Sequence, residues 1–361
     1  MQLRRSILLA LCIILFIYFE IHSCSEDRIA EPKPDMPKTS DLICDASDVF
    51  FLNPQVGWMA GSYGTLIKTE DGGKSWKSVR VDDGRFCDIT FTNKWDGWAI
   101  GKDGAFYRTR DGGENWERVI SAGLPDDEDF SRVVFFGDSI GYALGYHGVY
   151  RSVDAGNNWQ NNWLPVVPYR GAWGMSFVNG RIGFLLGCRW LDEDPVIIYK
   201  TTDGAESWME VEGSNASVLR TIVTIYFIDE NTGWAGGGAI KKTVDGGKHW
   251  VTQLEPATVR DFCFLNYRDG FAVGGSRVLK TTDGGNTWID ITPSDDRIID
   301  LRSVQFIDSM NGWIAGRGRE EYVRGTLLKH SLFLRTSDGG ETWEIKDFIF
   351  NLTEFLETQN K

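Results

Sequence analysis

Hydrophobic and polar positions alternate along most of the chain in short runs that turn residues separate. One kind of run ends on a phenylalanine, first at Phe51, and the next run carries an aromatic residue between two glycines, first in Gly57-Trp58-x-x-Gly61. A period of two with frequent glycine-rich turns is typical of β-strands. The pattern therefore predicts an all-β fold.

One segment, S/T-x-D-x-G-x-x-W, recurs seven times, first from Thr69 to Trp76. Only one copy departs from it, with Ala205 at the second glycine. The aspartates of the seven copies are Asp71, Asp111, Asp154, Asp203, Asp245, Asp283 and Asp338. A glycine-aromatic-x-x-glycine motif precedes every copy, and a phenylalanine stands six residues before its first glycine. The constant register makes each unit one structural module.

Each module contains four short runs, here named strands A to D. Strand A carries the phenylalanine, strand B carries the aromatic residue between the glycines, and the aspartate segment fills the turn between strands C and D. Seven four-stranded units whose faces are buried on one another predict a seven-bladed β-propeller of antiparallel strands over residues 45–347.

The aspartate segment suggests turn chemistry more strongly than metal chemistry. An aspartate in such a turn accepts hydrogen bonds from nearby backbone N–H groups, and the glycines supply positive φ angles. Calcium is the alternative, but each segment offers only one carboxylate. We therefore expect the seven aspartates to be structural, and we expect no metal and no cofactor.

The seven segments resemble the Asp box, or bacterial neuraminidase repeat, of a known class of propellers. The pairing of G-W-x-x-G with T-x-D-G-G-x-x-W is most similar to the photosystem II stability/assembly factor family and its relatives in non-photosynthetic bacteria. Sialidases, xyloglucan-cleaving enzymes and sortilin-type receptors share the box, so the resemblance implies the fold more firmly than the function.

The first 23 residues differ from the rest in having a basic start and an apolar run from Ile7 to Phe19. This pattern predicts a signal peptide. Ile21 to Cys24 resembles a bacterial lipobox, which implies lipidation of Cys24 and attachment to the outer membrane or surface of a Gram-negative cell; a simple signal peptide is the alternative. Residues 24–44 are interpreted as a flexible tether. Residues 348–361 form a C-terminal tail in which Phe348 to Phe350 could add an edge strand.

The top face of the predicted propeller, which carries the B–C and D–A loops, holds every sizeable insertion, including the expanded B–C connections of blade 4 (Cys188 to Pro195) and blade 7 (Arg317 to about Leu328). Length variation favours this face as the functional one. Arginines shortly before the strand-A phenylalanines should surround the upper mouth of the central channel: Arg85, Arg132, Arg170, Arg220, Arg260 and Arg302. The resemblance implies a role for them, because the assembly factors bind their client protein through an arginine-rich face. The alternative is that some of them pair with top-loop acids such as Asp126, Asp127, Asp129, Asp295 and Asp296.

The net charge of −13 makes a cationic mouth a local exception on this chain. Tryptophans that neither the boxes nor strand B uses also lie in or beside the top loops, at Trp163, Trp173 and Trp190. Exposed aromatic residues suit protein contacts or sugar stacking, although these three could instead pack the loops onto the propeller.

These features predict a monomeric, non-catalytic binding or assembly module. Its partner would be a protein segment or a glycan, with no nucleic acid and with membrane contact only through the lipid. The alternative is a glycoside hydrolase. Such an enzyme needs two carboxylates across a cleft. The candidates for these carboxylates are Asp192, Glu193, Asp194, Glu320 and Glu321. Cys44 and Cys87 could meet in a disulfide, but buried free thiols are the favoured interpretation, and the absence of any CxxC pair gives no support to a metal or redox motif.

Overall fold

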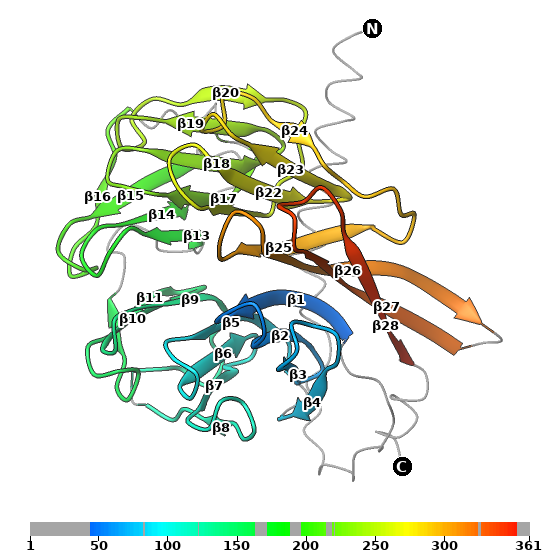
Figure 1. Cartoon of the computed structure of the whole chain (residues 1–361). Helices are drawn as coiled ribbons and strands as arrows, with labels where there is room; N and C mark the ends of the chain where they lie inside the picture. Colours follow the sequence, from blue (N-terminus) through cyan, green and yellow to red (C-terminus); the bar gives the residue numbers. More distant parts are fainter. Residues whose placement is uncertain are drawn as a thin grey trace, which may run out of the picture. The chain divides into compact units, whose positions relative to one another are not determined.

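The computed structural model describes residues 44–81, 84–121, 123–162, 172–187, 196–213, 219, 221–323 and 326–351. All of them belong to one compact unit, Thr39–Glu354. They form 28 strands in seven four-stranded sheets, each with consecutive antiparallel strands (Figure 1). The predicted seven-bladed propeller is confirmed. Nowhere in these ranges is there a helix with the length and apolarity to cross a membrane.

The strands of the first four blades follow the motif register. Blade 1 contains β1 (Cys44–Phe51), β2 (Gly57–Ser62), β3 (Thr65–Thr69) and β4 (Lys77–Arg80). Blade 2 contains β5 (Phe86–Phe91), β6 (Gly97–Gly101), β7 (Phe106–Thr109) and β8 (Glu117–Arg118). Blade 3 contains β9 (Phe130–Phe136), β10 (Ile140–Gly145), β11 (Gly148–Ser152) and β12 (Gln160–Asn162). Blade 4 contains β13 (Ala172–Phe177), β14 (Gly183–Gly187), β15 (Ile197–Thr201) and β16 (Met209–Glu210).

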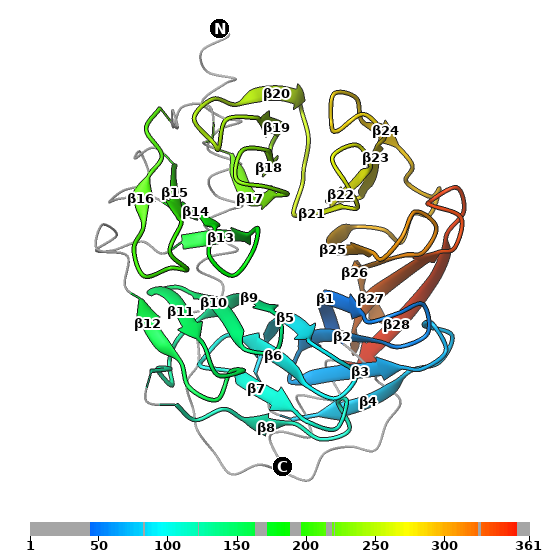
Figure 2. The ribbon, with the colours of Figure 1, turned by 60° about the vertical axis from the view of Figure 1, so that its left-hand side comes forward.

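The last three blades repeat the order. Blade 5 contains β17 (Ile222–Phe227), β18 (Gly233–Gly237), β19 (Ile240–Thr243) and β20 (Val251–Leu254). Blade 6 contains β21 (Asp261–Phe264), β22 (Gly270–Gly274), β23 (Arg277–Thr281) and β24 (Ile289–Asp290). Blade 7 contains β25 (Asp300–Phe306), β26 (Gly312–Val323), β27 (Thr326–Thr336) and β28 (Glu344–Asn351). Figure 2 shows the blades arranged in a ring.

Aromatic stacking joins every blade to the next. The strand-A phenylalanine of each blade lies flat on the strand-B aromatic ring of the preceding blade, with ring centroids 3.5–3.9 Å apart at all seven interfaces. The box tryptophan meets the phenylalanine of its own blade edge-on, as Trp76 meets Phe51. A Cβ added at Gly57 would lie 2.5 Å from the Phe51 ring, so the strand-B glycine is required for this contact. The motif register is thus a packing register.

The Asp boxes close the C–D turns on the bottom face. Asp71 accepts hydrogen bonds from the Ser75 backbone N–H at 2.8 Å and from the Thr69 hydroxyl at 2.8 Å. The N–H of Gly72 donates to the carbonyl of Gln55 in the A–B turn of the same blade, and the other six blades repeat this bond. The box therefore fastens one bottom turn onto the other.

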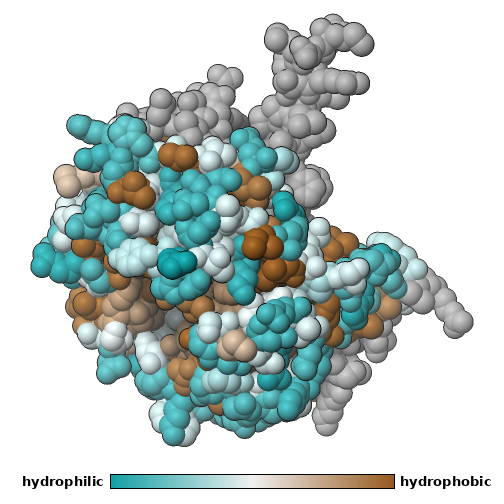
Figure 3. All heavy atoms as spheres, turned by 45° about the horizontal axis from the view of Figure 1, so that its top comes forward, coloured by the Kyte–Doolittle hydropathy of each residue, from teal (hydrophilic) through white to brown (hydrophobic). Residues whose placement is uncertain are grey.

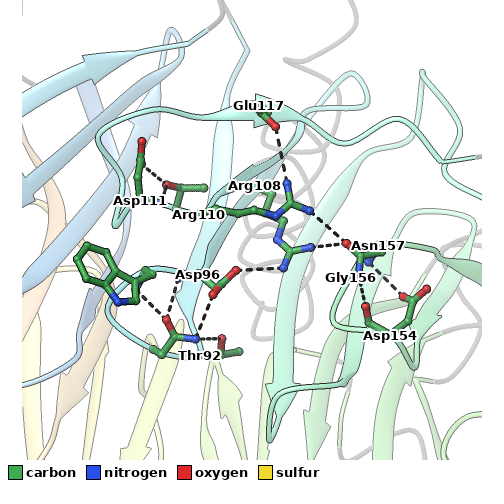
Figure 4. A network of polar contacts seen from close by, with 12 residues as sticks. Thr92, Asp96, Arg108, Arg110, Asp111, Glu117, Asp154, Gly156 and Asn157 are labelled. Atoms are coloured by element: carbon green, nitrogen blue, oxygen red, sulfur yellow. Dashed lines mark hydrogen bonds and ion pairs between the residues drawn. The ribbon is translucent and has the colours of Figure 1, made fainter.

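Side chains of adjacent blades also meet on this face (Figure 4). Arg108 on β7 donates to Asp96 of its own blade at 3.1 Å and to Asn157 in the box of blade 3 at 2.8 Å. Arg110 reaches the same Asn157 oxygen at 3.1 Å. These bottom-face contacts hold turns and adjacent blades together, so they are structural.

Blade 7 differs from the loop that the sequence suggested. The segment from Arg317 to Leu328, expected as an expanded B–C connection, instead lengthens β26 and β27 into a long hairpin. Phe348 and Phe350 continue β28 along the side of this hairpin, opposite Ser331 and Lys329. Cross-strand pairing therefore converts the insertion into a three-stranded extension.

Candidate functional site

One position on each inner strand, three residues before the strand-A phenylalanine, forms a layer around the channel, and in blade 4 a glycine occupies it. Reading from blade 1 to blade 7, these residues are Asp48, Asp88, Arg132, Gly174, Thr224, Asp261 and Ser303. The Arg132 guanidinium reaches across from blade 3 to blade 6 and donates to Asp261 at 3.1 Å. This layer therefore contains three carboxylates and one arginine.

The aspartates of this layer also hold neighbouring blades together. Asp48 accepts the backbone N–H of Ile89 at 2.9 Å, and Asp261 accepts that of Val304 at 3.0 Å. Asp88 accepts the N–H of Val133 at 2.5 Å. Desolvation in the channel and the nearby Asp48 carboxylate raise the pKa of Asp88 well above its usual value. The aspartates of this layer therefore have a structural role: each links its blade to the next through a backbone hydrogen bond.

A cluster of arginines lies nearer the top, around Asp300 at the start of β25. Asp300 accepts hydrogen bonds from Arg260 at 2.8 Å and from Arg302 and Arg317 at 3.1 Å each. Its side chain is 8% exposed. Burial opposes its charge, but the three guanidinium groups together hold its pKa below the usual value. We call Asp300 with these three arginines the mouth cluster.

Like charges crowd this cluster. Desolvation and the neighbouring Arg317 lower the pKa of Arg302, and Arg85 acts on it in the same direction. Three guanidinium groups thus converge on one carboxylate, on a chain of net charge −13. Such a group can attract carboxylates.

The arginines predicted from the sequence separate into two levels. Arg260 and Arg302 meet in the mouth cluster, Arg85 lies beside them just before β5, and Arg132 lies deeper among the aspartates. The top-loop acids pair with other cations: Asp129 with Lys102, and Asp295 with Arg297. Arg170 and Arg220 lie outside the described residues.

The sequence did not identify Arg317 or Asp300 as part of the site. Arg317 belongs to the segment expected as a loop, and its contact with Asp300 arises only because β26 continues beside β25. The channel aspartates were also missed, although their shared offset from the phenylalanines could have been found in the sequence.

Of the three tryptophans considered for partner contacts, the structure describes Trp173. It lies on β13, is 37% exposed, and donates through Nε1 to the carbonyl of Ile222 in blade 5. Trp163, Trp190 and the lipidation candidate Cys24 lie outside the described residues. Figure 3 shows a face that is largely hydrophilic, with apolar side chains in small separate patches.

The residues considered for catalysis do not form a pair in the described part of the chain. Glu320 pairs with Lys329 at 3.2 Å, and Glu321 lies one residue further along β26 with its side chain exposed. Asp192, Glu193 and Asp194 are outside the described residues. Cys44, Cys87 and Cys263 are free thiols. Among the described residues, no group of three or more His, Cys, Asp or Glu side chains is arranged to hold a metal ion.

Comparison with known proteins agrees with this architecture. A family model described as "Photosynthesis system II assembly factor YCF48" matches residues 38–163. A photosystem II assembly lipoprotein, Ycf48 of Synechococcus sp. (strain CC9902), is 27% identical over 221 residues. That alignment covers 59% of this chain and 51% of the relative, so it spans about half the relative's length.

Solved structures show the same fold at low identity. "YCF48 bound to D1 peptide" superposes with a TM-score of 0.61 at 19% identity, covering 81% of this chain and 96% of the other. YCF48 from Cyanidioschyzon merolae gives 0.57 at 21% identity, with 76% and 92% covered. A family GH74 xyloglucanase from Xanthomonas campestris gives 0.53 at 13% identity, with 84% and 62% covered.

The boxes, the blades and these matches define a seven-bladed Asp-box propeller. Within that class the chain is Ycf48-like: it is similar in sequence and fold to the photosystem II assembly factors.

Proposed function

We propose that this protein is a non-catalytic binding or assembly module, anchored in the cell envelope through Cys24, whose top face binds a segment of another protein. The observation that carries the proposal is the mouth cluster, in which Arg260, Arg302 and Arg317 surround one buried carboxylate. A segment with acidic side chains or a free carboxyl end fits a positive mouth at the end of the channel.

The relatives support the choice of a protein partner. One solved Ycf48 is bound to a D1 peptide, and the cyanobacterial relative is a lipoprotein. Both statements concern those proteins. For this chain they support an envelope-anchored module that binds a polypeptide, without indicating that its partner is a photosystem subunit.

Arg260→Glu tests the proposal directly. Arg260 is the mouth arginine to change, because its side chain is 31% exposed whereas that of Arg302 is 10% exposed. We expect a short fluorescent peptide with acidic side chains and a free carboxyl end to bind the wild type and to bind the variant at least about tenfold more weakly. Fluorescence anisotropy at two salt concentrations measures this loss, and higher salt should weaken binding to the wild type.

Arg268→Glu is the matched control, since Arg268 lies in the A–B turn on the bottom face and donates to the carbonyl of Thr282. The control should bind the peptide like the wild type, and thermal unfolding should show both variants folded. Equal peptide affinities of wild type and Arg260→Glu would refute the mouth cluster as the binding site. A neutral glycan that binds while every peptide fails would refute the choice of a protein partner.

A further inference from the structure

A cavity of about 380 Å³ lies where the extended hairpin of blade 7 meets the first strand of blade 1. Its walls come from Arg317 to Glu320 on β26, from Lys329 and His330 on β27, and from Asp45 and Ile299. We call it the blade-7 cavity. Its volume lies in the range of small-molecule sites, about 300–1,000 Å³.

Both strands that border the cavity are irregular at the residues that line it. The β26–β27 register shifts between Arg317 and Glu320, which leaves Gly318 and Arg319 in a bulge. The β1–β2 register shifts between Cys44 and Asp48, and Asp45 adopts φ of 45°. Bulges re-aim side chains and concentrate next to functional sites, and a non-glycine residue with positive φ is kept only where the surroundings enforce it.

Glycine is required in the β26 bulge by a close contact. A Cβ at Gly318 would lie 2.8 Å from the Cβ of His330, which is closer than side chains tolerate. The small residue therefore lets the bulged backbone approach β27.

The charges on the walls favour one monovalent anion. Lys329 lies 3.1 Å from Asp45 and 3.2 Å from Glu320, so it neutralises much of the acidic side. Arg319 pairs with Asp296 at 2.6 Å, but the Asp296 side chain is 80% exposed. Such surface pairs contribute about 0–1 kcal/mol, so a bound carboxylate can replace this one. Asp45 and Glu320 would repel a dianion.

His330 adds a hydrogen-bonding group. Its Nδ1 lies 3.0 and 2.9 Å from the two carboxylate oxygens of Asp347. A carboxylate only accepts, so Nδ1 donates its proton to Asp347; in the neutral form of an imidazole this tautomer leaves Nε2 as an acceptor. Nε2 is buried and makes no hydrogen bond with any residue in the described ranges, which is unusual for a buried nitrogen. Ile299, 48% exposed, provides an apolar wall.

We propose that the blade-7 cavity is a second binding site, which takes a small monocarboxylate bearing an O–H or N–H donor beside the carboxylate. Arg319 binds the carboxylate, His330 accepts from the neighbouring donor, and Ile299 contacts a short apolar group. A free hydroxy acid and the terminal residue of a peptide share this chemistry. Arg317 lines the cavity and also belongs to the mouth cluster, whereas Arg319, His330 and Ile299, which carry this proposal, lie outside that cluster.

Titration of the full chain with four probes tests the proposal: lactate, N-acetyl-alanyl-alanine, the C-terminal amide of that dipeptide, and inorganic phosphate. NMR chemical-shift changes should show binding of lactate or of the dipeptide acid, and much weaker binding of the amide and of phosphate. Binding by lactate alone would identify a free acid as the ligand source, and binding by the dipeptide acid alone would identify a chain end.

Two variants locate the binding. Arg319→Gln should lower the affinity for the carboxylate ligand by about tenfold, the loss expected for a charge-assisted hydrogen bond. Gly318→Ala should also lower the affinity for the carboxylate ligand, without a change of charge, because the added Cβ pushes against His330. Arg268→Gln, on the bottom face, should leave the affinity unchanged. The proposal fails if no carboxylate binds, if the amide binds as well as the acid, or if Arg319→Gln binds like the wild type.

Discussion

At the scale of single residues, aspartates in this propeller have two opposite electrostatic environments. Box aspartates accept several hydrogen bonds from their own turn, which lowers the pKa of Asp203 to about 2 although burial opposes this. The channel aspartates lie in a desolvated layer with few cations, and the pKa of Asp88 is raised there. The same residue type therefore stabilises the bottom turns as an anion and fastens the inner strands partly as a neutral acid.

Asp88→Asn is expected to stabilise the protein at neutral pH. The folded chain holds a proton on Asp88 that the unfolded chain releases near about pH 4, so wild-type stability falls as the pH rises from about 4 through the raised pKa. Asparagine keeps an oxygen for the Val133 N–H and cannot ionise. We expect a gain of roughly 1 kcal/mol or more at about pH 7, vanishing towards pH 4, measured by urea unfolding.

Asp203→Asn should show the opposite pH dependence. The lowered pKa of Asp203 means that its stabilisation is present above about pH 4 and is lost as the pH falls towards 2. This variant should be less stable than the wild type at neutral pH and similar to it in acid. If Asp88→Asn instead behaves like Asp203→Asn, then Asp88 is ionised in the folded chain.

At the scale of the strand, the repeated glycine before the strand-B aromatic residue carries the interblade contact. Its missing side chain leaves room for the strand-A phenylalanine, which then stacks on the preceding blade. This explains why the spacing of the strand-A phenylalanine, the strand-B glycine and the aromatic residue after that glycine is constant, although other connections in the modules vary in length.

Gly97→Ala should destabilise the propeller by about 1–3 kcal/mol, the usual cost of overpacking a core. The new Cβ would lie 2.4 Å from the Phe91 ring and would displace it from Trp58. Gly84→Ala is the control, because its nearest contact would be Ala105 Cβ at 3.4 Å. Thermal unfolding compares the two. Equal melting temperatures would mean that the stack tolerates the shift.

The sequence allowed the blades to be predicted because each motif residue fills a local steric role. The candidate site was harder to predict from the sequence. Arg132 and Asp261 are 129 positions apart and meet only because the ring closes. Arg317 joins Arg260 only because residues that look like a loop pair as strands. Top-face arginines were predictable as a group, whereas their carboxylate partners depend on the position of each strand in the ring.

At the scale of the molecule, the junction between blade 1 and blade 7 is distinctive. Each of these blades is built from its own consecutive strands, so only non-covalent contacts join the first blade to the last. Gln305 accepts from the N–H of Phe51 and donates to its carbonyl at 3.2 Å. Ser303 donates to Asp48 at 2.5 Å, and Ser331 accepts from the N–H of Ala46. Both the mouth cluster and the blade-7 cavity lie beside this junction.

Gln305→Ala should open this junction before the rest of the ring. It removes both hydrogen bonds to Phe51 and leaves two half-buried backbone groups unsatisfied, at a cost of about 1–3 kcal/mol. Hydrogen exchange should accelerate most in β1 and in β25 to β28, since local openings follow cooperative units. Ser176→Ala removes the comparable bond to Phe227 between blades 4 and 5, which are consecutive in the chain, so its effect should not be concentrated at the termini. If both variants accelerate exchange evenly around the ring, the junction between blades 1 and 7 is no weaker than the others. The propeller that carries the two proposed sites then unfolds as one cooperative unit.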